Sequence, residues 1–365
     1  DSSSMFVLVL LFVLCLVTSR DNKPIELQVN GNHYQIGWHL GRETKKAVQS
    51  LFAEDPILNQ KLIPFYQTER GKEVFDHLYR VNNDRFPEYM DELKGLAAGA
   101  EVEFYKVFMS TLNEEFRDYV GEEYAYAPKE SCSDVIINDG PSYGICHNED
   151  GSLLDFDRTF LVTFILETRD KKETFTAYCY AGQLPTAAFG FNSHIAFTMN
   201  YLHTKKGDYD GIARNFIARH LLSATSFDDA VNRITSLPHC VGHNYQIMDL
   251  DDGRLIDLEV APFYRVGSLR PLPGRPHFHS NMYSLLMVDD TPSESSIHRE
   301  KRYKEMKEPT SFAEALEVLS DEKDVIEPIY RNTTLNTVVF NFYTHWLYIY
   351  SGPANKGNVV YDCRL

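Results

Sequence analysis

The sequence predicts a layered α+β domain, because helical patterns fill its first third and strand patterns dominate after Cys132. In the second part, short apolar runs are separated by turn residues such as Asp139-Gly140-Pro141, which is typical of strands joined by hairpins. The chain has 365 residues, 43% of them hydrophobic, which is enough to bury a large core. Its length permits one large domain or two, and we expect one.

The N-terminus carries an uninterrupted apolar run over residues 5–17. This run is short for a bilayer span and has the length of a signal-peptide core, so we interpret residues 1–19 as a signal peptide. A signal anchor is the alternative. Either interpretation directs the chain to the secretory pathway, as a secreted or lysosomal protein if the segment is removed and as an anchored protein if it is kept.

The first third is expected to be a strand followed by helices. A short strand is predicted over residues 25–30, and helices are predicted over residues 31–52, 60–80, 87–99 and 103–115. Gly37 and Gly41 lie four residues apart on one helical face, a spacing that lets another backbone approach closely.

Strands dominate the rest of the chain. They are predicted over residues 135–138, 143–147, 160–167, 175–180, 194–199, 244–250, 254–260, 335–341 and 346–350. Helical patterns return over residues 211–222, 226–236, 294–307 and 311–320, and a polar, proline-rich connection covers residues 262–276. The run over residues 160–166 is apolar on both faces, which indicates a sheet covered on each side.

Charge and ligand patterns exclude several classes of partner. The chain holds 36 basic and 52 acidic residues, a net charge of −16, which argues against nucleic acid or an anionic membrane as a partner. No Cys-x-x-Cys motif occurs, and the histidines at 194, 203, 243, 277 and 279 match no familiar zinc spacing. The sequence therefore predicts no metal and no cofactor.

Cys132 stands directly before a predicted strand, a position that suits a nucleophile held on a rigid sheet. Its thiol can attack the carbonyl carbon of Ser131; hydrolysis of the resulting ester then frees the α-amino group of Cys132. That amine, with an ordinary pKa of about 7.7–8.0, is a suitable base at neutral pH. The alternative is a buried strand cysteine. Outside the apolar N-terminal run five cysteines remain, which fits one working thiol and at most two disulfides.

A second polar group lies at the end of the next predicted strand. Asn148, Glu149 and Asp150 follow Cys132 by up to eighteen residues, and a hairpin brings them back to it. An acid at this place can hydrogen-bond a terminal ammonium or orient a nucleophile. The alternative is an ordinary turn.

Nine motifs in order carry a family resemblance. They are Gly31-x-x-Tyr34-x-x-Gly37 with Gly41, residues 92–99, Ser131-Cys132, Asn148-x-Asp150, residues 180–185, residues 197–200, Gly242-x-Asn244-Tyr245, Ser295-Ser296-x-x-Arg299 and residues 334–340. With these motifs the chain resembles the N-terminal-nucleophile hydrolases of the penicillin (isopenicillin N) acyltransferase type, and most of all their animal tan-type members, the β-alanyl-dopamine/carcinine hydrolases. The resemblance implies a four-layer αββα sandwich with a helical N-terminal segment.

The resemblance also implies roles for individual residues. Cys132 would become the N-terminal nucleophile through cleavage between Ser131 and Cys132. Asp150 would hydrogen-bond its amine or thiol, and Arg299 would lower the thiol pKa and steady Asp150. Asn244 and Asn200 would form the oxyanion hole. Cleavage would divide the chain into residues 20–131 and residues 132–365, and the two chains would remain associated.

The implied reaction is hydrolysis of a small linear amide through an acyl-Cys132 intermediate, with an N-β-alanyl amine as the leading substrate. We expect Asn148 and Glu149 to contribute to substrate binding, and Glu149, Asp155 or Asp157 to meet the ammonium group. Acyl transfer, hydrolysis of penicillin-type or fatty amides, and a catalytically silent binding protein remain alternatives. Ser131 stands where many relatives have glycine, and His147 where the bile-salt hydrolase branch has arginine.

Overall fold

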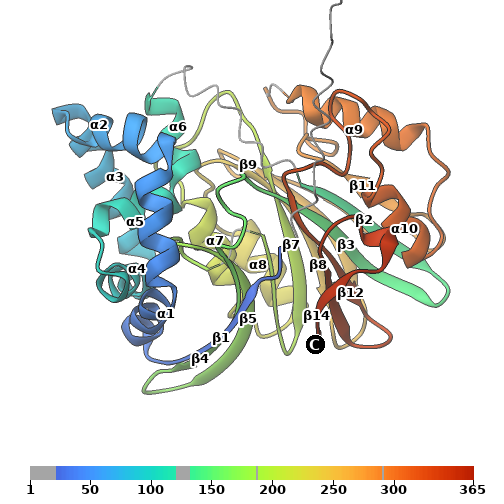
Figure 1. Cartoon of the computed structure of the whole chain (residues 1–365), viewed down its shortest axis with the longest axis horizontal. Coiled ribbons are helices and arrows are strands. Elements are labelled where there is room, and N and C mark those ends of the chain that lie inside the picture. The colour runs from blue at the N-terminus through green and yellow to red at the C-terminus, as the bar shows by residue number, and fades with distance from the viewer. Residues whose placement is uncertain (1–21, 121–131, 186–187, 290–291) are drawn as a thin grey trace, which may run out of the picture.

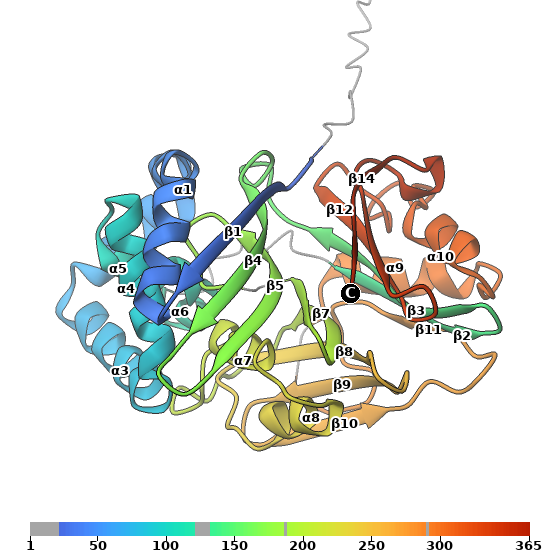
Figure 2. The ribbon, with the colours of Figure 1, turned by 90° about the horizontal axis from the view of Figure 1, so that it is seen from below.

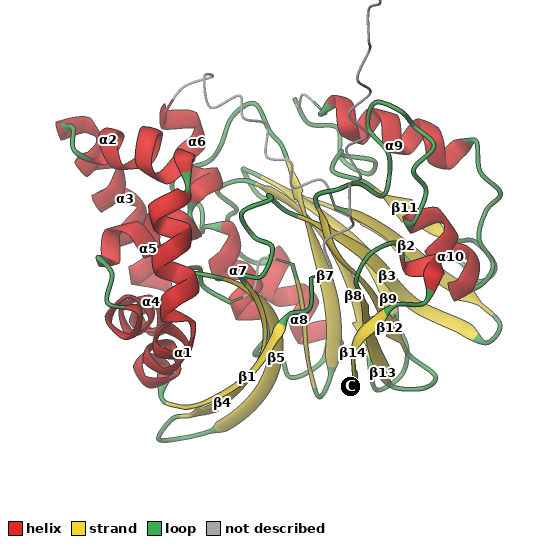
Figure 3. Cartoon of the chain, in the orientation of Figure 1, coloured by secondary structure: helices red, strands yellow, loops and turns green. Residues whose placement is uncertain are grey.

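The computed structural model of the chain describes residues 22–120, 132–185, 188–289 and 292–365. Over these ranges it forms four layers: helices, an eight-stranded sheet, a six-stranded sheet and helices again (Figure 1, Figure 3). The expected αββα arrangement is thereby confirmed. Residues 1–19, interpreted above as a signal peptide, lie outside the described residues. Among the described residues no helix is long and apolar enough to cross a membrane.

The eight-stranded sheet follows the order β1-β4-β5-β6-β7-β8-β9-β10. Its strands are β1 (Ile25–Gly31), β4 (Thr159–Glu167), β5 (Lys172–Tyr180), β6 (Phe189–Asn192), β7 (Ile195–Leu202), β8 (Gly242–Asp249), β9 (Leu255–Ala261) and β10 (Arg265–Leu269). Figure 2 shows β1 along β4, with which it pairs in parallel, whereas β4 and β5 pair antiparallel. The N-terminal segment therefore contributes an edge strand to this sheet, as well as helices.

The six-stranded sheet follows the order β11-β2-β3-β12-β13-β14 and is antiparallel. Its strands are β2 (Ser133–Asp139), β3 (Ser142–Asp150), β11 (His277–His279), β12 (Thr334–Asn341), β13 (Trp346–Tyr350) and β14 (Val359–Arg364). The sequence prediction missed β6, β11 and β14, and it was wrong for residues 262–276, which contain β10. These strands are short or largely exposed, so they lack the continuous apolar run by which buried strands are recognised.

The helices divide between the two outer layers. They are α1 (His33–Glu54), α2 (Ile63–Tyr66), α3 (Glu69–Arg85), α4 (Pro87–Ala100), α5 (Phe104–Thr111), α6 (Asn113–Val120), α7 (Arg214–Leu221), α8 (Phe227–Thr235), α9 (Glu294–Lys304) and α10 (Phe312–Leu319). The helix expected over residues 60–80 is instead a π-helical turn (Leu58–Leu62), α2 and α3. Thr68 caps the start of α3 by accepting a hydrogen bond from the Gly71 amide at 2.9 Å, which explains this break.

Glycines let α1 and α4 touch backbone to backbone. A Cβ at Gly37 would lie 2.0 Å from the carbonyl oxygen of Glu92, and one at Gly95 would lie 2.1 Å from that of Tyr34. Gly41 and Gly99 meet the facing helix in the same way. The close approach predicted from Gly37 and Gly41 is confirmed, and α4 supplies the matching glycines.

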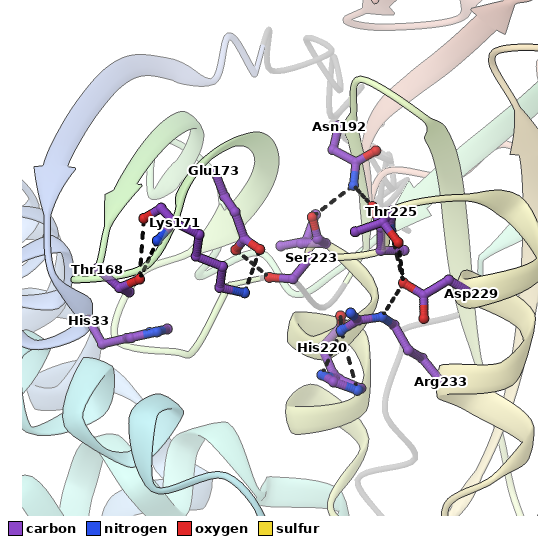
Figure 4. A network of polar contacts seen from close by, with 12 residues as sticks. His33, Thr168, Lys171, Glu173, Asn192, His220, Ser223, Thr225, Asp229 and Arg233 are labelled. Atoms are coloured by element: carbon purple, nitrogen blue, oxygen red, sulfur yellow. Dashed lines mark hydrogen bonds and ion pairs between the residues drawn. The ribbon is translucent and has the colours of Figure 1, made fainter.

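Polar contacts fasten α7 and α8 to the eight-stranded sheet (Figure 4). Ser223, just after α7, donates to Glu173 of β5 at 3.1 Å, and Asn192 of β6 donates to the Ala224 carbonyl at 2.7 Å. Arg233 of α8 donates to the His220 carbonyl of α7 at 3.1 Å. These contacts, together with an apolar core that joins helices and sheet, fix this face of the molecule.

Candidate active site

The hairpin of β2 and β3 places four reactive side chains on one face. Asp134 pairs with His147 and Ser133 with Asn148, so Cys132 stands beside Glu149. Because side chains alternate along a strand, Cys132, Asp134, His147 and Glu149 all point to the interior between the two sheets. The register of this hairpin therefore brings the candidate nucleophile, Cys132, together with two carboxyl groups and an imidazole.

The Cys132 thiol is buried and donates to a Glu149 carboxylate oxygen at 3.5 Å. The other oxygen of Glu149 accepts the hydroxyl of Tyr180 from β5. Burial raises the pKa of the thiol to about 12; the Glu149 carboxylate adds to this rise and His147 opposes it. Cys132 is therefore a neutral thiol that is hydrogen-bonded to the Glu149 carboxylate.

His147 lies between two carboxylates. Its Nδ1 is 3.0 Å from Asp134, and its Nε2 is 2.9 Å from the Glu149 oxygen that meets the thiol. Burial alone would lower the pKa of His147, but Asp134 and Glu149 hold it well above its usual value. Asp134 also accepts from Thr198 at 2.6 Å and from the amide of Asn200. The imidazole is thus charged and held in one orientation.

Asn200 and Asn244, the expected oxyanion donors, lie opposite each other on β7 and β8 and are fully buried. The amide of Asn200 donates to Asp134, and that of Asn244 donates to Asp257. Asp257 is in turn 2.5 Å from His277 of the other sheet. The structure therefore places Asn200 in the hydrogen-bond network of the thiol and Asn244 beside it on the paired strand, with one N–H of each amide committed to a carboxylate.

Arg299 of α9 approaches Cys132 from the outer face of the six-stranded sheet. Its guanidinium donates to the Cys132 carbonyl oxygen, to Ser133 Oγ at 2.9 Å and to Asn281 Oδ1 at 2.9 Å. Burial lowers the pKa of Arg299 to about 10, with Arg331 adding to the effect, so it remains a cation at neutral pH. Arg299 thus fixes the backbone at the nucleophile.

Asp150 lies on the opposite face of the hairpin from the thiol. It accepts from Thr334 at 2.5 Å and forms an ion pair with Arg331 at 3.2 Å. Burial raises its pKa to about 6, against the effect of Arg331. The carboxylate that contacts the thiol is therefore Glu149, and the cation that pairs with Asp150 is Arg331.

Asn148 also faces away from the thiol. Its amide donates to the Leu319 carbonyl at 2.8 Å and its oxygen accepts from Thr337 at 2.6 Å, which ties β3 to β12 and α10. Through these contacts Asn148 stabilises the hairpin against its neighbours. Ser131, the other half of the expected cleavage site, lies outside the described residues.

Sequence reasoning missed Asp134, Tyr180 and Arg331, and it noted His147 only as a departure from relatives. The turn at Asp139-Gly140-Pro141 could have predicted that two of these residues, Asp134 and His147, lie together. Counting back from that turn along both strands places Asp134 opposite His147. Tyr180 and Arg331 come from distant strands and loops, so no local spacing predicts them.

Comparison with known proteins gives the same assignment as the motifs. The family described as "Acyl-coenzyme A:6-aminopenicillanic acid acyl-transferase" matches residues 138–356. The chain therefore belongs to this penicillin acyltransferase-like family of amide hydrolases and acyltransferases, and the resemblance inferred from the sequence is confirmed.

The individual relatives share only a small part of their sequence with this chain. The "Beta-alanyl-dopamine/carcinine hydrolase" of Drosophila melanogaster is 24% identical over 384 residues, which cover 96% of this chain and 97% of the relative. An N-acylethanolamine-hydrolyzing acid amidase ortholog of Caenorhabditis elegans is 12% identical, with a TM-score of 0.41 over 64% of this chain and 99% of that chain. Penicillin V acylase from Agrobacterium tumefaciens is 13% identical, with a TM-score of 0.32 over 60% of this chain and 82% of that chain.

Proposed function

We propose that the chain is a self-processing cysteine amidohydrolase that forms its acyl intermediate on Cys132. The observation that carries this proposal is the contact of the buried thiol with Glu149 at the start of β2. A thiol becomes a strong nucleophile when a neighbouring group takes its proton. Arg299 holds the Cys132 carbonyl, so the backbone beside the reacting bond is fixed as well.

In the uncleaved chain, Glu149 accepts the thiol proton as Sγ attacks the carbonyl carbon of Ser131. The C–N bond then breaks and its nitrogen takes up a proton. Water hydrolyses the thioester, which leaves a carboxylate on Ser131 and a free amine on Cys132. The charged His147 beside Glu149 stabilises the carboxylate before the transfer and the thiolate after it.

In the mature enzyme the new amine serves as the base for substrate cleavage, and Asn200 and Asn244 stabilise the oxyanion. An amide NH2 group carries two N–H donors, and each asparagine commits one of them to a carboxylate. The second N–H of Asn200 remains to meet the oxyanion, whereas that of Asn244 has to give up a 3.5 Å contact with the Leu258 carbonyl to do so. Asp150, electrostatically coupled to the thiol, tunes proton affinity at the site.

Mass spectrometry of the intact protein under denaturing, reducing conditions tests the processing step. We expect two fragments that meet at Ser131 and Cys132. Cys132→Ala is expected to give one uncleaved, inactive chain, whereas Cys146→Ala, a buried cysteine on the other face of the hairpin, is expected to be cleaved normally. An active Cys132→Ala protein would rule out the mechanism. Asp150→Asn and Asn244→Ala are expected to fold but to lose turnover.

The substrate class we propose is an N-β-alanyl amine. A relative that aligns over nearly the whole chain carries that activity in its name, which supports the proposal. Of the three acids expected to meet the ammonium group, Glu149 is occupied by the thiol, His147 and Tyr180, and Asp157 is exposed. Asp155 is partly buried, and its Oδ2, which accepts a single backbone amide (Ser152, 2.7 Å), would lie 3.0 Å from a Cβ at Gly151, next to Asp150. We therefore propose Asp155 as the ammonium acceptor.

A pair of substrates tests this assignment. Asp155→Asn is expected to lower kcat/KM for β-alanyl-dopamine by about 10- to 100-fold, the effect of losing one charge-assisted hydrogen bond. The same variant is expected to leave kcat/KM for propionyl-dopamine nearly unchanged, because that amide lacks the ammonium group. Equal losses with both substrates would show that Asp155 acts on folding or on the chemical step.

A further inference from the structure

We propose that Cys132, His147 and Glu149 form a zinc site through which Zn²⁺ reversibly blocks the nucleophile. Among the described residues these three offer ligand atoms that all lie within 4.8 Å of one another, and all three are buried. The Cys132 Sγ is 3.5 Å from Glu149 Oε2, and the His147 Nε2 is 2.9 Å from the same oxygen. Tetrahedral zinc separates its ligands by roughly 3.3–3.8 Å, so only a small opening of the cluster admits the ion.

The ligand types match zinc. Thiolate, imidazole and carboxylate are its three protein ligands, and a site with three of them keeps a fourth position for water or another donor. The Cys132 amine freed by processing is such a donor. Zinc binding releases two protons to solvent, one from the Cys132 thiol and one from Nε2 of His147. The proton on Nδ1 of His147 stays in its hydrogen bond with Asp134.

Two of the ligands, His147 and Glu149, also have a partner behind them. His147 directs Nδ1 to Asp134, the carboxylate–histidine arrangement that orients zinc-bound imidazoles, and Asp134 is itself held by Thr198 and the amide of Asn200. Tyr180 holds the second oxygen of Glu149. His147 and Glu149 are thus held in place beside the thiol before any ion binds.

The sequence predicted no metal because its histidine and cysteine spacings match no known zinc pattern. These ligands come from two paired strands, so their proximity depends on hairpin register and leaves no local motif. The inference builds on the proposed function only in that the blocked thiol is the proposed nucleophile. Metal binding is therefore measured without substrate.

Cobalt(II) is the direct probe, because it occupies zinc sites and gives a charge-transfer band when a thiolate binds it. We expect the wild-type protein to bind one Co²⁺ with this band and to release it to Zn²⁺. Cys132→Ser should lose the band, and Glu149→Gln should bind at least 10-fold more weakly. Asp134→Asn, which removes only the partner of His147, should weaken binding by about 10- to 100-fold.

Cys363→Ser is the matched control, since Cys363 is a free and partly exposed thiol. It should keep the band; a band lost in this variant but kept in Cys132→Ser would place the metal elsewhere and overturn the proposal, as would absence of any band in the wild type. In the hydrolysis assay, stoichiometric Zn²⁺ should abolish turnover and a chelator should restore it. Turnover by the metal-free protein together with no cobalt band would refute the zinc site and leave the amidohydrolase proposal intact. A cobalt band together with no turnover by the metal-free protein would do the reverse.

Discussion

Histidines behave in opposite ways on the two sides of the eight-stranded sheet. Between the sheets, His147 and His279 each meet carboxylates, which raise the pKa of both rings despite their burial. Under the helices, burial lowers the pKa of His220 to about 3, that of His239 to about 4 and that of His243 well below its usual value. One residue type is therefore a cation on one side and neutral on the other.

The difference lies in what each layer buries. The candidate site occupies a polar interior in which acids, histidines and amides of both sheets pair with one another. The helix-facing side is an apolar core, in which Glu92 and Arg219 form a buried ion pair at 2.7 Å. The titratable groups of the candidate site therefore lie in the layer where acids, histidines and amides pair with one another.

The largest expected effect comes from breaking the ion pair in the apolar layer. Arg219→Met leaves Glu92 buried without its bidentate partner, so we expect the free energy of unfolding to fall by about 3–5 kcal/mol. Denaturant unfolding measures this change. Arg42→Met, which breaks an exposed pair with Glu43, should cost less than about 1 kcal/mol. Equal effects would mean that burial does not set the value of these pairs.

Thr198→Val tests the polar interior, because it removes the 2.6 Å hydrogen bond to Asp134 and keeps the side-chain shape. A hydrogen bond to a charged group is worth about 1.5–3 kcal/mol, and we expect that loss in unfolding free energy. Thr163→Val removes a neutral contact with Thr176 at 3.1 Å and should cost about 1 kcal/mol. A larger loss at Thr163 would contradict the assignment of Asp134 as a charged acceptor.

A smaller change tests packing in the helical layer. Gly95→Ala places a methyl group against the Tyr34 carbonyl, so α1 and α4 must separate, at a cost of about 1–3 kcal/mol. Thermal unfolding followed by circular dichroism measures it. Ala98→Ser, at an exposed position on the same helix, is expected to change stability by less than about 0.5 kcal/mol. An unchanged Gly95→Ala protein would show that the helices have room to adjust.

The pH dependence of stability tests the neutral histidines. His220 accepts from Arg233 at 3.1 Å, and its pKa is lowered to about 3, first by burial and then by Arg233 (Figure 4). The unfolded chain therefore binds the proton first, near pH 6.5, and stability falls as pH drops from there toward 3. The loss is at most about 1.4 kcal/mol per pH unit, and less because the ring is partly exposed.

His220→Gln should flatten this part of the acid profile, as measured by urea unfolding at pH 7 and pH 5. His239 and His243 add losses of the same sign, so the comparison is the difference between wild type and variant. An identical pH dependence in the two proteins would show that folding does not shift the pKa of His220.

Local sequence pattern predicted most of the helices and strands and the position of the thiol. Cys132 stands before the apolar run of β2, a turn follows, and β3 returns with acids at its end, so local pattern predicted the hairpin and its nucleophile. The spacing of Gly37 and Gly41 likewise predicted a close contact between two helices. Short or exposed strands such as β6 and β14 carried too little apolar signal to be seen.

The tertiary structure decided which side chains share the site. Alternation along β3 turns Glu149 toward the thiol and Asp150 away from it, and this parity follows from the pairing of β2 with β3. Arg331 reaches Asp150, and Tyr180 reaches Glu149, only because distant strands are layered against this hairpin. Contacts between residues far apart in sequence leave no local spacing, so only packing of the two sheets could reveal them.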